Sequence, residues 1–294
     1  MSKIIDDLKL QYKIGGISQK LIYWNVAIFA IPYIIFGLLG LFNIHINFLN
    51  YVSLSSNPAD LLWKPWSIIT YAFFHSDIFH IFFNLMVLNF SSRLFLTYFT
   101  QKQFLSLYFS GIIFSGIIYI LCYYLFLSLA NLHVTLIGAS GAIMAVLFAA
   151  VSYAPLTEIR LFLIGNVKLW HIAFALIVID LVQLPLENTG GHLAHLGGAL
   201  FGFLYAKQMI RGTDLGLLVS KILDFFVNLF SKSEKIPFKK VHKNYSKPVA
   251  KPVSKIITKD KTQQQIDEIL DKISKSGYDS LSSLEKEFLF KAGK

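Results

Sequence analysis

Near the middle of the chain, a long apolar run opens with Leu136-Ile137-Gly138-Ala139-Ser140-Gly141-Ala142-Ile143-Met144. Glycine, alanine and serine let membrane helices approach each other closely, so this run predicts a tightly packed membrane helix. The serine between two glycines has two interpretations, a packing position or a nucleophile. The run alone favours packing, and the other polar residues of the chain are needed to decide.

The composition indicates an all-α integral membrane protein. Of the 294 residues, 55% are hydrophobic and only 15% are charged, whereas a soluble domain usually carries about a quarter charged residues. The N-terminal segment lacks the apolar core and the cleavage site of a signal peptide, so the first hydrophobic segment is expected to stay as a membrane span. The single cysteine, Cys122, excludes an internal disulfide.

Apolar runs of roughly twenty residues, the length that crosses about 30 Å of hydrocarbon, predict a six-transmembrane helical bundle. The predicted spans are 22–42, 77–97, 104–127, 137–154, 169–186 and 192–210. Lys and Arg near the span ends concentrate on the side of the N-terminus, which predicts that both termini face the cytoplasm. The second, fourth and sixth spans would then all enter the membrane from the outside.

The flanking regions predict a cytoplasmic C-terminal extension. The expected order is an N-terminal segment 1–21, the six-span domain 22–211, an amphipathic interfacial helix 212–231, a basic flexible linker 232–262 and a small helical module 263–294. The linker carries much of the net charge of +10, which favours attraction to an anionic lipid bilayer. No folded basic platform is evident, so nucleic acid is not expected as a partner.

The C-terminal module is expected to form two short helices separated at Ser276–Gly277, with Ser280 or Ser283 capping the second helix. We expect it to dock to a cytoplasmic partner that the sequence does not identify.

Polar side chains inside membrane spans are energetically expensive and mark candidate functional sites. Here they gather at one depth in three predicted spans. His80 and Asn84 lie four residues apart on one helix face, where they could stabilise an oxyanion or join two helices by hydrogen bonds. Ser140 and His195 begin the other two spans.

Gly198 and Gly202 form a small-residue face that would press the sixth span against the fourth. His195 lies on about the same side as Gly198. This packing would bring its imidazole within hydrogen-bond reach of Ser140, which is the nucleophile–base geometry of serine catalysis.

Other polar residues receive structural interpretations. His75 is expected to face the loop and make a structural hydrogen bond, and His192 is expected to be a surface or supporting histidine. Asp180 could make an interhelical hydrogen bond, which we favour, or complete a triad. The candidate site is therefore a Ser–His dyad. A metal site built from the histidines lacks Cys and suitably spaced carboxylates, so no metal and no cofactor are expected.

Three motifs resemble those of the rhomboid intramembrane serine proteases. Gly138-Ala139-Ser140-Gly141 resembles GxSG, Ala194–Gly202 resembles AHxxGxxxG, and His75–Asn84 resembles the HxxxxHxxxN pattern of the second span. The resemblance covers about residues 15–210. It implies that Ser140 is the nucleophile and His195 its base.

The same resemblance implies an oxyanion hole formed by His80, Asn84 and backbone amides near Ala139 and Ser140. Gly138 and Gly141 are expected to pack at the site, as small residues do between membrane helices. The chain departs from the family where Trp66-Ser67 replaces a common Trp-Arg pair and where Met144 replaces a common aromatic residue. The C-terminal module lies outside the core family pattern.

The expected function is that of a serine endopeptidase that cleaves single-span transmembrane proteins near the outer membrane boundary. The alternative is a non-catalytic rhomboid-like protein that binds membrane clients. The topology and the lack of a targeting peptide suit a bacterial inner (plasma) membrane.

Overall fold

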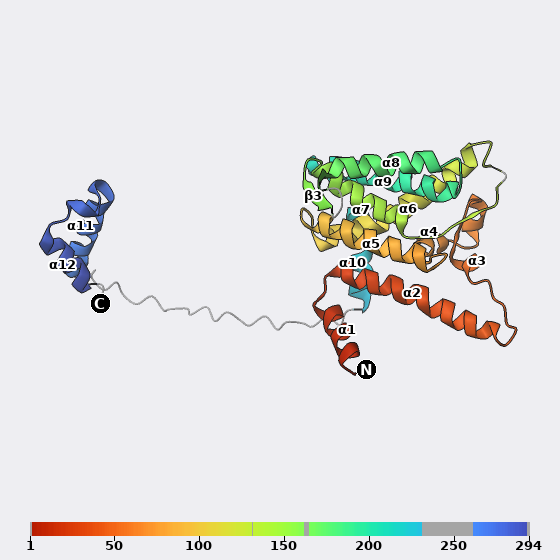
Figure 1. Ribbon diagram of the computed structural model, residues 1–294, viewed down its shortest axis with the longest axis horizontal. Helices are drawn as coiled ribbons and strands as arrows, with labels where there is room; N and C mark the ends of the chain where they lie inside the picture. The colour runs from red at the N-terminus through yellow and green to blue at the C-terminus, as the bar shows by residue number, and fades with distance from the viewer. Residues whose placement is uncertain (1, 131, 162–164, 231–260, 293–294) are drawn as a thin grey trace, which may run out of the picture. The chain divides into compact units, whose positions relative to one another are not determined.

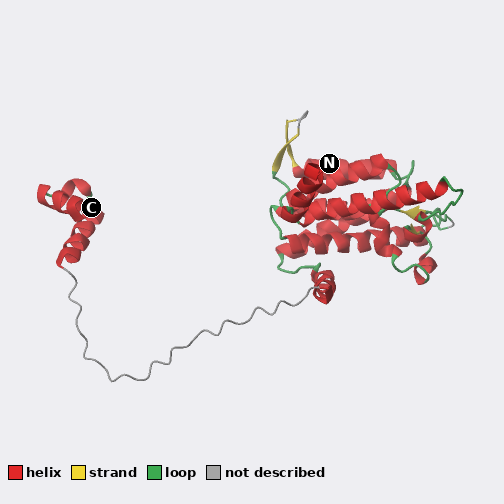
Figure 2. Ribbon diagram, turned by 90° about the horizontal axis from the view of Figure 1, so that it is seen from below, coloured by secondary structure: helices red, strands yellow, loops and turns green. Residues whose placement is uncertain are grey.

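The computed structural model describes residues 2–130, 132–161, 165–230 and 261–292 (Figure 1). The chain divides into two units, Met1–Ser233 and Glu234–Lys294. The predicted linker over 232–262 lies almost wholly outside the described residues. Figure 2 shows that helices dominate both units and that strands are few and short.

The first unit contains one helix on each of the six predicted apolar runs. They are α2 (Ile17–Gly40), α5 (Ile78–Leu96), α6 (Gln101–Leu125), α7 (Ser140–Tyr153), α8 (Leu169–Gln183) and α9 (Thr189–Ile210). Within the described residues, α2, α5 and α6 are long and apolar enough to cross a membrane. The helices α7 and α8 have only 14 and 15 residues. The helix α9 is continuous over 22 residues, and its apolar sequence contains several glycines and two histidines.

Short elements connect and flank these helices. Between α2 and α5 the chain forms α3 (Leu49–Val52), β1 (Leu54–Ser55), a 3-10 turn (Pro58–Leu62), α4 (Ser67–Thr70) and a second 3-10 turn (Tyr71–Phe73). Strand β1 pairs antiparallel with β2 (Thr135–Leu136), and β3 (Glu158–Leu161) pairs with β4 (Gly165–Lys168). The remaining helices of this unit are α1 (Ser2–Ile14) and α10 (Leu217–Phe230).

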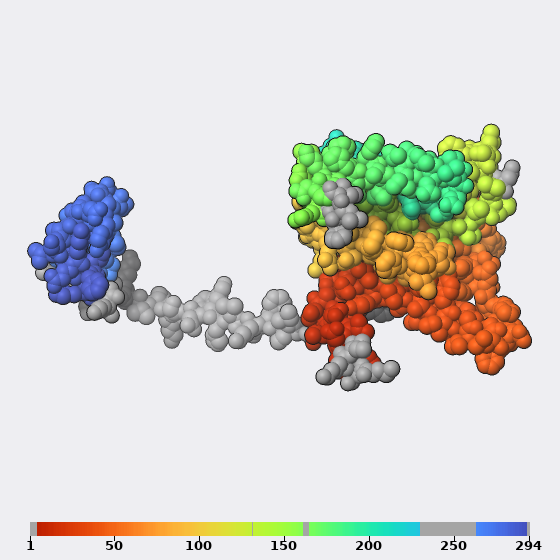
Figure 3. Space-filling model, viewed as in Figure 1, coloured from red at the N-terminus to blue at the C-terminus, as the bar shows by residue number. Residues whose placement is uncertain are grey.

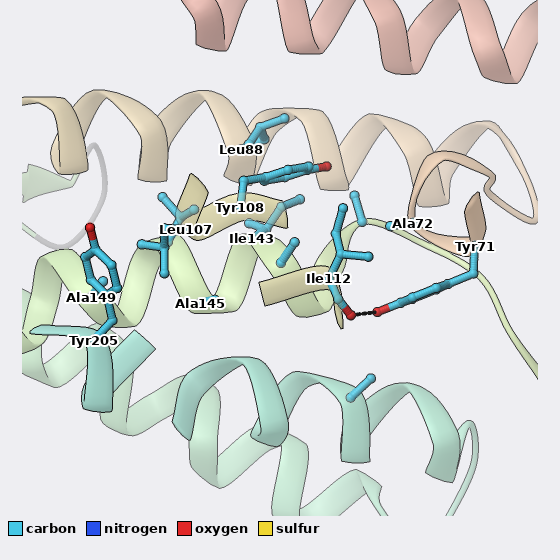
Figure 4. Close-up of a cluster of buried hydrophobic side chains, with 14 of the residues drawn as sticks. Tyr71, Ala72, Leu88, Leu107, Tyr108, Ile112, Ile143, Ala145, Ala149 and Tyr205 are labelled. Atoms are coloured by element: carbon cyan, nitrogen blue, oxygen red, sulfur yellow. Dashed lines mark hydrogen bonds between the residues drawn. The ribbon is translucent and has the colours of Figure 1, made fainter. Parts of the chain in front are cut away.

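The helix α7 lies at the centre of the unit. It packs against α5, α6, α8 and α9, while α2 packs chiefly on α5 (Figure 1). Figure 4 shows the buried side chains around it, including Ile143 and Ala145 of α7, Leu88 of α5 and Tyr205 of α9. Because Ala142, Ala145 and Ala149 are small and buried, neighbouring backbones can approach α7 closely.

The predicted fourth span, 137–154, begins too early. The helix starts only at Ser140, because Gly138 has a φ of +122° that a right-handed helix does not allow. The Gly138 amide donates instead to the Tyr71 carbonyl at 2.9 Å. This turn places Ser140 in the first turn of α7, where backbone amides lack helical partners.

The helix α10 corresponds to the predicted amphipathic helix 212–231. Its Asp224 carboxylate forms an ion pair of 2.6 Å with Lys102 of α6. Most of its large apolar side chains, including Phe225, Phe226 and Leu229, are exposed in the structure. Such a face suits burial in a lipid interface.

The C-terminal unit contains α11 (Lys261–Ser276), a 3-10 turn (Tyr278–Ser280) and α12 (Ser283–Ala292). Gly277 separates the two helices with a φ of +79°. The prediction of Ser280 or Ser283 as the cap of the second helix is wrong. The cap is Ser282, whose hydroxyl accepts from the Glu285 amide while the Glu285 carboxylate accepts from the Ser282 amide, a reciprocal capping box.

Candidate active site

The helices α7 and α9 meet where two glycines of α9 face small residues of α7. A methyl group on Gly198 would collide with the carbonyl of Gly141, and one on Gly202 would collide with the carbonyl of Ala145. Only hydrogen side chains permit this close approach. The contact places the N-terminal parts of the two helices, which carry Ser140 and His195, side by side.

Ser140 and His195 line the same cavity. Its volume is about 280 Å³. Its walls come from α5, α7, α8 and α9, and it is lined by Phe83, Asn84, Val87, Ser140, Ile143, Met144, Leu176, Ile179, Asp180, His192 and His195. Among the described residues no hydrogen bond joins the Ser140 hydroxyl to His195. The cavity therefore gathers the predicted dyad, Asn84 and Met144.

Asp180 of α8 holds two histidines of α9. Its Oδ1 atom lies 2.8 Å from Nδ1 of His195 and 2.7 Å from Nδ1 of His192. The carboxylate is buried, with 6% of its side chain exposed. The favoured sequence interpretation, an interhelical hydrogen bond, is therefore incomplete, because the bond also fixes the imidazole of the predicted base.

This contact determines which nitrogen of His195 faces the cavity. A carboxylate oxygen accepts a proton from Nδ1, so the neutral imidazole presents an unprotonated Nε2. An Nε2 lone pair is what a general base needs to accept the proton of a serine hydroxyl. Asp180 thus gives His195 the tautomer and the ring orientation of the histidine in a Ser-His-Asp arrangement.

His80 approaches the turn before Ser140. A Cβ placed on Gly138 would lie 2.8 Å from Nε2 of His80 and 3.8 Å from Oγ of Ser140. The Ser76 amide donates to Nδ1 of His80 at 3.3 Å, while the Ser76 hydroxyl donates to Asp77. Because a backbone amide can only donate, Nδ1 is an acceptor and the proton of the neutral ring is assigned to Nε2, which is then a donor beside Gly138.

Asn84 lies one helical turn after His80 and lines the cavity. Its amide nitrogen donates to the His80 carbonyl at 2.9 Å. Its Oδ1 atom is buried without a hydrogen-bond partner among the described residues. A buried unpaired amide oxygen is uncommon in folded proteins.

His75 does not face the loop as the sequence predicted. Its side chain is fully buried, and neither ring nitrogen has a hydrogen-bond partner within the described part of the chain. The ring instead contacts His80 edge-on, with 5.0 Å between ring centroids, and Phe29 of α2 at 6.3 Å. The prediction failed because the chain before α5 packs against α2, where Phe29 contacts His75.

His192 is largely buried and shares the Asp180 carboxylate with His195, which fits the supporting position and not the surface position that the sequence left open. The sequence places His192 three residues before His195. It had not shown that a carboxylate of another helix lies opposite both.

Comparison with known proteins shows the family of the chain. The Rhomboid domain family model matches residues 62–212, just over half of the chain, and the chain belongs to the rhomboid family. A second model, a family of unknown function (DUF6576), matches residues 257–291 of the C-terminal module.

Individual relatives share about a third of their residues with this chain over the matched region. The chain is 32% identical over 155 residues to presenilin-associated rhomboid-like protein A, mitochondrial, of Danio rerio, a match that covers 51% of this chain and 39% of the relative. It is 30% identical over 220 residues to presenilin-associated rhomboid-like protein, mitochondrial, of Rattus norvegicus, covering 68% and 55%. The chain thus spans well under two thirds of the length of these relatives.

Proposed function

We propose that this protein is an intramembrane serine endopeptidase that cleaves single-span transmembrane proteins. The observation that carries the proposal is the shared cavity of Ser140 and His195, with His195 held by Asp180. In the proposed reaction, the Ser140 hydroxyl attacks the scissile carbonyl and Nε2 of His195 takes its proton. His195 then protonates the leaving amine, and water releases the acyl group from Ser140.

The negative charge of the tetrahedral intermediate would be stabilised near the start of α7. Donors in this region are the Nε2–H group of His80 and the backbone amides of Ala139 and Ser140 at the positive end of the helix dipole. The Asn84 side chain lines the same cavity. Its amide nitrogen carries two N–H groups, so the one not bonded to the His80 carbonyl could donate to an oxyanion.

Substrate access is proposed between α5 and α8. Both helices pack on α7, few of their backbone positions come close to each other, and both contribute apolar side chains to the cavity wall. Phe83 and Ile179 are about half exposed and offer a lipid-facing entrance. Both helices lie on the face of the unit shown in Figure 3, α5 in orange and α8 in green.

The proposed arrangement in the membrane follows the distribution of basic residues. The six helices on the predicted apolar runs would all cross the bilayer, both termini would face the cytoplasm, and cleavage would occur near the outer boundary. Because exposed backbone groups are costly in lipid, the substrate would unwind close to that boundary. The bacterial inner membrane and a cytoplasmic partner of the C-terminal module remain predictions.

The test is cleavage of a model single-span substrate in liposomes. The wild type is expected to cleave it, whereas Ser140→Ala and His195→Ala are expected to lose activity. Equal cleavage by all three proteins would exclude the proposed dyad. Loss of activity with a chelator would indicate metal-dependent hydrolysis instead.

A second candidate function is the binding of membrane clients without cleavage. It is favoured by one observation, the lack of a hydrogen bond between the Ser140 hydroxyl and His195 within the described residues. In the same liposomes, this function predicts that wild type and Ser140→Ala both retain the substrate intact and with the same affinity.

A further inference from the structure

We propose that Asp180, His192 and His195 form a binding site for a transition-metal dication, with Zn²⁺ as the best match, and that an ion bound there inhibits the protein. One ligand atom from each residue lies within 4.8 Å of the other two. The inhibitory effect rests on the proposed serine protease function, whereas the binding site itself does not.

The donor set fits zinc. Two imidazole nitrogens and one carboxylate oxygen are its common ligands, and a fourth tetrahedral position can be filled by water. The present Nδ1–Oδ1 distances of 2.7 and 2.8 Å are those of hydrogen bonds. Zinc bonds of about 2.0–2.2 Å would require these atoms to separate by roughly half an ångström, which is a small side-chain movement.

The surroundings of Asp180 favour the binding of a cation over a purely structural role of both histidines. A carboxylate needs only one imidazole to orient it as in a triad, yet here two imidazoles converge on the same Oδ1 atom. The carboxylate is buried, and its negative charge has no Lys or Arg partner among the described residues. The three residues also line a cavity, so an ion can reach them.

Binding of the ion would disable the base through its tautomer. Coordination uses the lone pair of Nδ1 of His195, so the proton of the neutral ring must move to Nε2. An Nε2–H group cannot accept the proton of the Ser140 hydroxyl. The bound ion therefore blocks proton transfer without touching the serine or the substrate.

Two measurements test the site. The first is substrate cleavage in liposomes with increasing Zn²⁺, in which each variant is normalised to its own metal-free rate. We expect Zn²⁺ to inhibit the wild type and a chelator to restore activity. The Zn²⁺ concentration for half inhibition is expected to rise at least about tenfold in His192→Ala. His171→Ala removes an exposed histidine of α8 and is expected to match the wild type.

The second measurement is the direct binding of Co²⁺, a spectroscopic substitute for Zn²⁺, to the Ser140→Ala protein. Binding is monitored by the visible absorption of Co²⁺. We expect bands of a tetrahedral site, lost when His192→Ala or His192→Gln is added and displaced by Zn²⁺. Equal spectra with and without His192, or equal Zn²⁺ inhibition of wild type and His192→Ala, would overturn the proposal. If the wild type shows no cleavage, the protease proposal fails while the Co²⁺ spectra still decide the metal site.

Discussion

Replacement of Asp180 by asparagine should slow catalysis while leaving the fold intact. Asp180→Asn keeps the size of the side chain but replaces a carboxylate with a neutral amide. The bond from Nδ1 of His195, at 2.8 Å to a buried oxygen, becomes charge-assisted on both sides when His195 takes the serine proton. The amide of the variant would present either a weaker acceptor or an opposing donor to this nitrogen.

The magnitude follows from the strength of such a bond. Hydrogen bonds to charged groups contribute about 1.5–3 kcal/mol, and each 1.36 kcal/mol in the barrier corresponds to about a tenfold change in rate. We therefore expect kcat to fall by about 10- to 150-fold. KM should change little, because the carboxylate acts on the histidine and not on the substrate.

The assay is initial-rate cleavage of a model substrate in liposomes, with thermal unfolding in detergent as a check of folding. The matched control is Asp224→Asn, which removes another interhelical carboxylate, at the exposed ion pair between α10 and Lys102. Exposed ion pairs contribute at most about 1 kcal/mol, so this variant should stay within about twofold of wild type. A folded Asp180→Asn protein with the same small effect would refute the role given to Asp180.

Three further predictions concern packing, the oxyanion and the C-terminal module. Gly198→Ala should lower the free energy of unfolding by about 1–3 kcal/mol, because its methyl group collides with a backbone carbonyl of α7; Gly37→Ala in α2, with open space around it, should not destabilise the protein in the same thermal unfolding experiment. His80→Phe should lower kcat by about 10²-fold through loss of an oxyanion donor, and an unchanged kcat would show that the donor is not used. In the C-terminal module, hydrogen bonds from Lys272 and Ser282 lower the pKa of Glu285 from 4.5 to about 2. Since its folded pKa lies below the unfolded value, the stabilisation is present above about pH 4.5 and is lost as pH falls towards 2. Methyl NMR signals of the full chain should report this loss, and Glu285→Gln should remove that pH dependence.

Sequence reasoning located the helices well, because each apolar run had room for one helix. It placed the start of α7 wrongly, because the positive φ of Gly138 and its bond to the Tyr71 carbonyl depend on a distant segment. Glycine adopts positive and negative φ about equally readily, so a glycine in a small-residue run can be helical or not until the segments packed around it are known.

In the candidate site, too, some residues could be predicted from local sequence, whereas others depend on distant segments. Ser140 and His195 could be paired from the small residues of α7 and α9 and from their common depth. Asp180 could not be assigned from sequence, since α8 offers no periodic signal that turns its carboxylate toward α9. The burial of His75 was missed for a similar reason, because it depends on how α2 covers the chain before α5.

The proposed activation of Ser140 by His195 can be measured by treating the membrane-reconstituted protein with a fluorophosphonate and locating the adduct by mass spectrometry. Attack by an activated serine forms a bond to phosphorus and expels fluoride. The account predicts one adduct, on Ser140, in the wild type and none in His195→Ala. An unlabelled wild type, or equal labelling of Ser140 with and without His195, would contradict it.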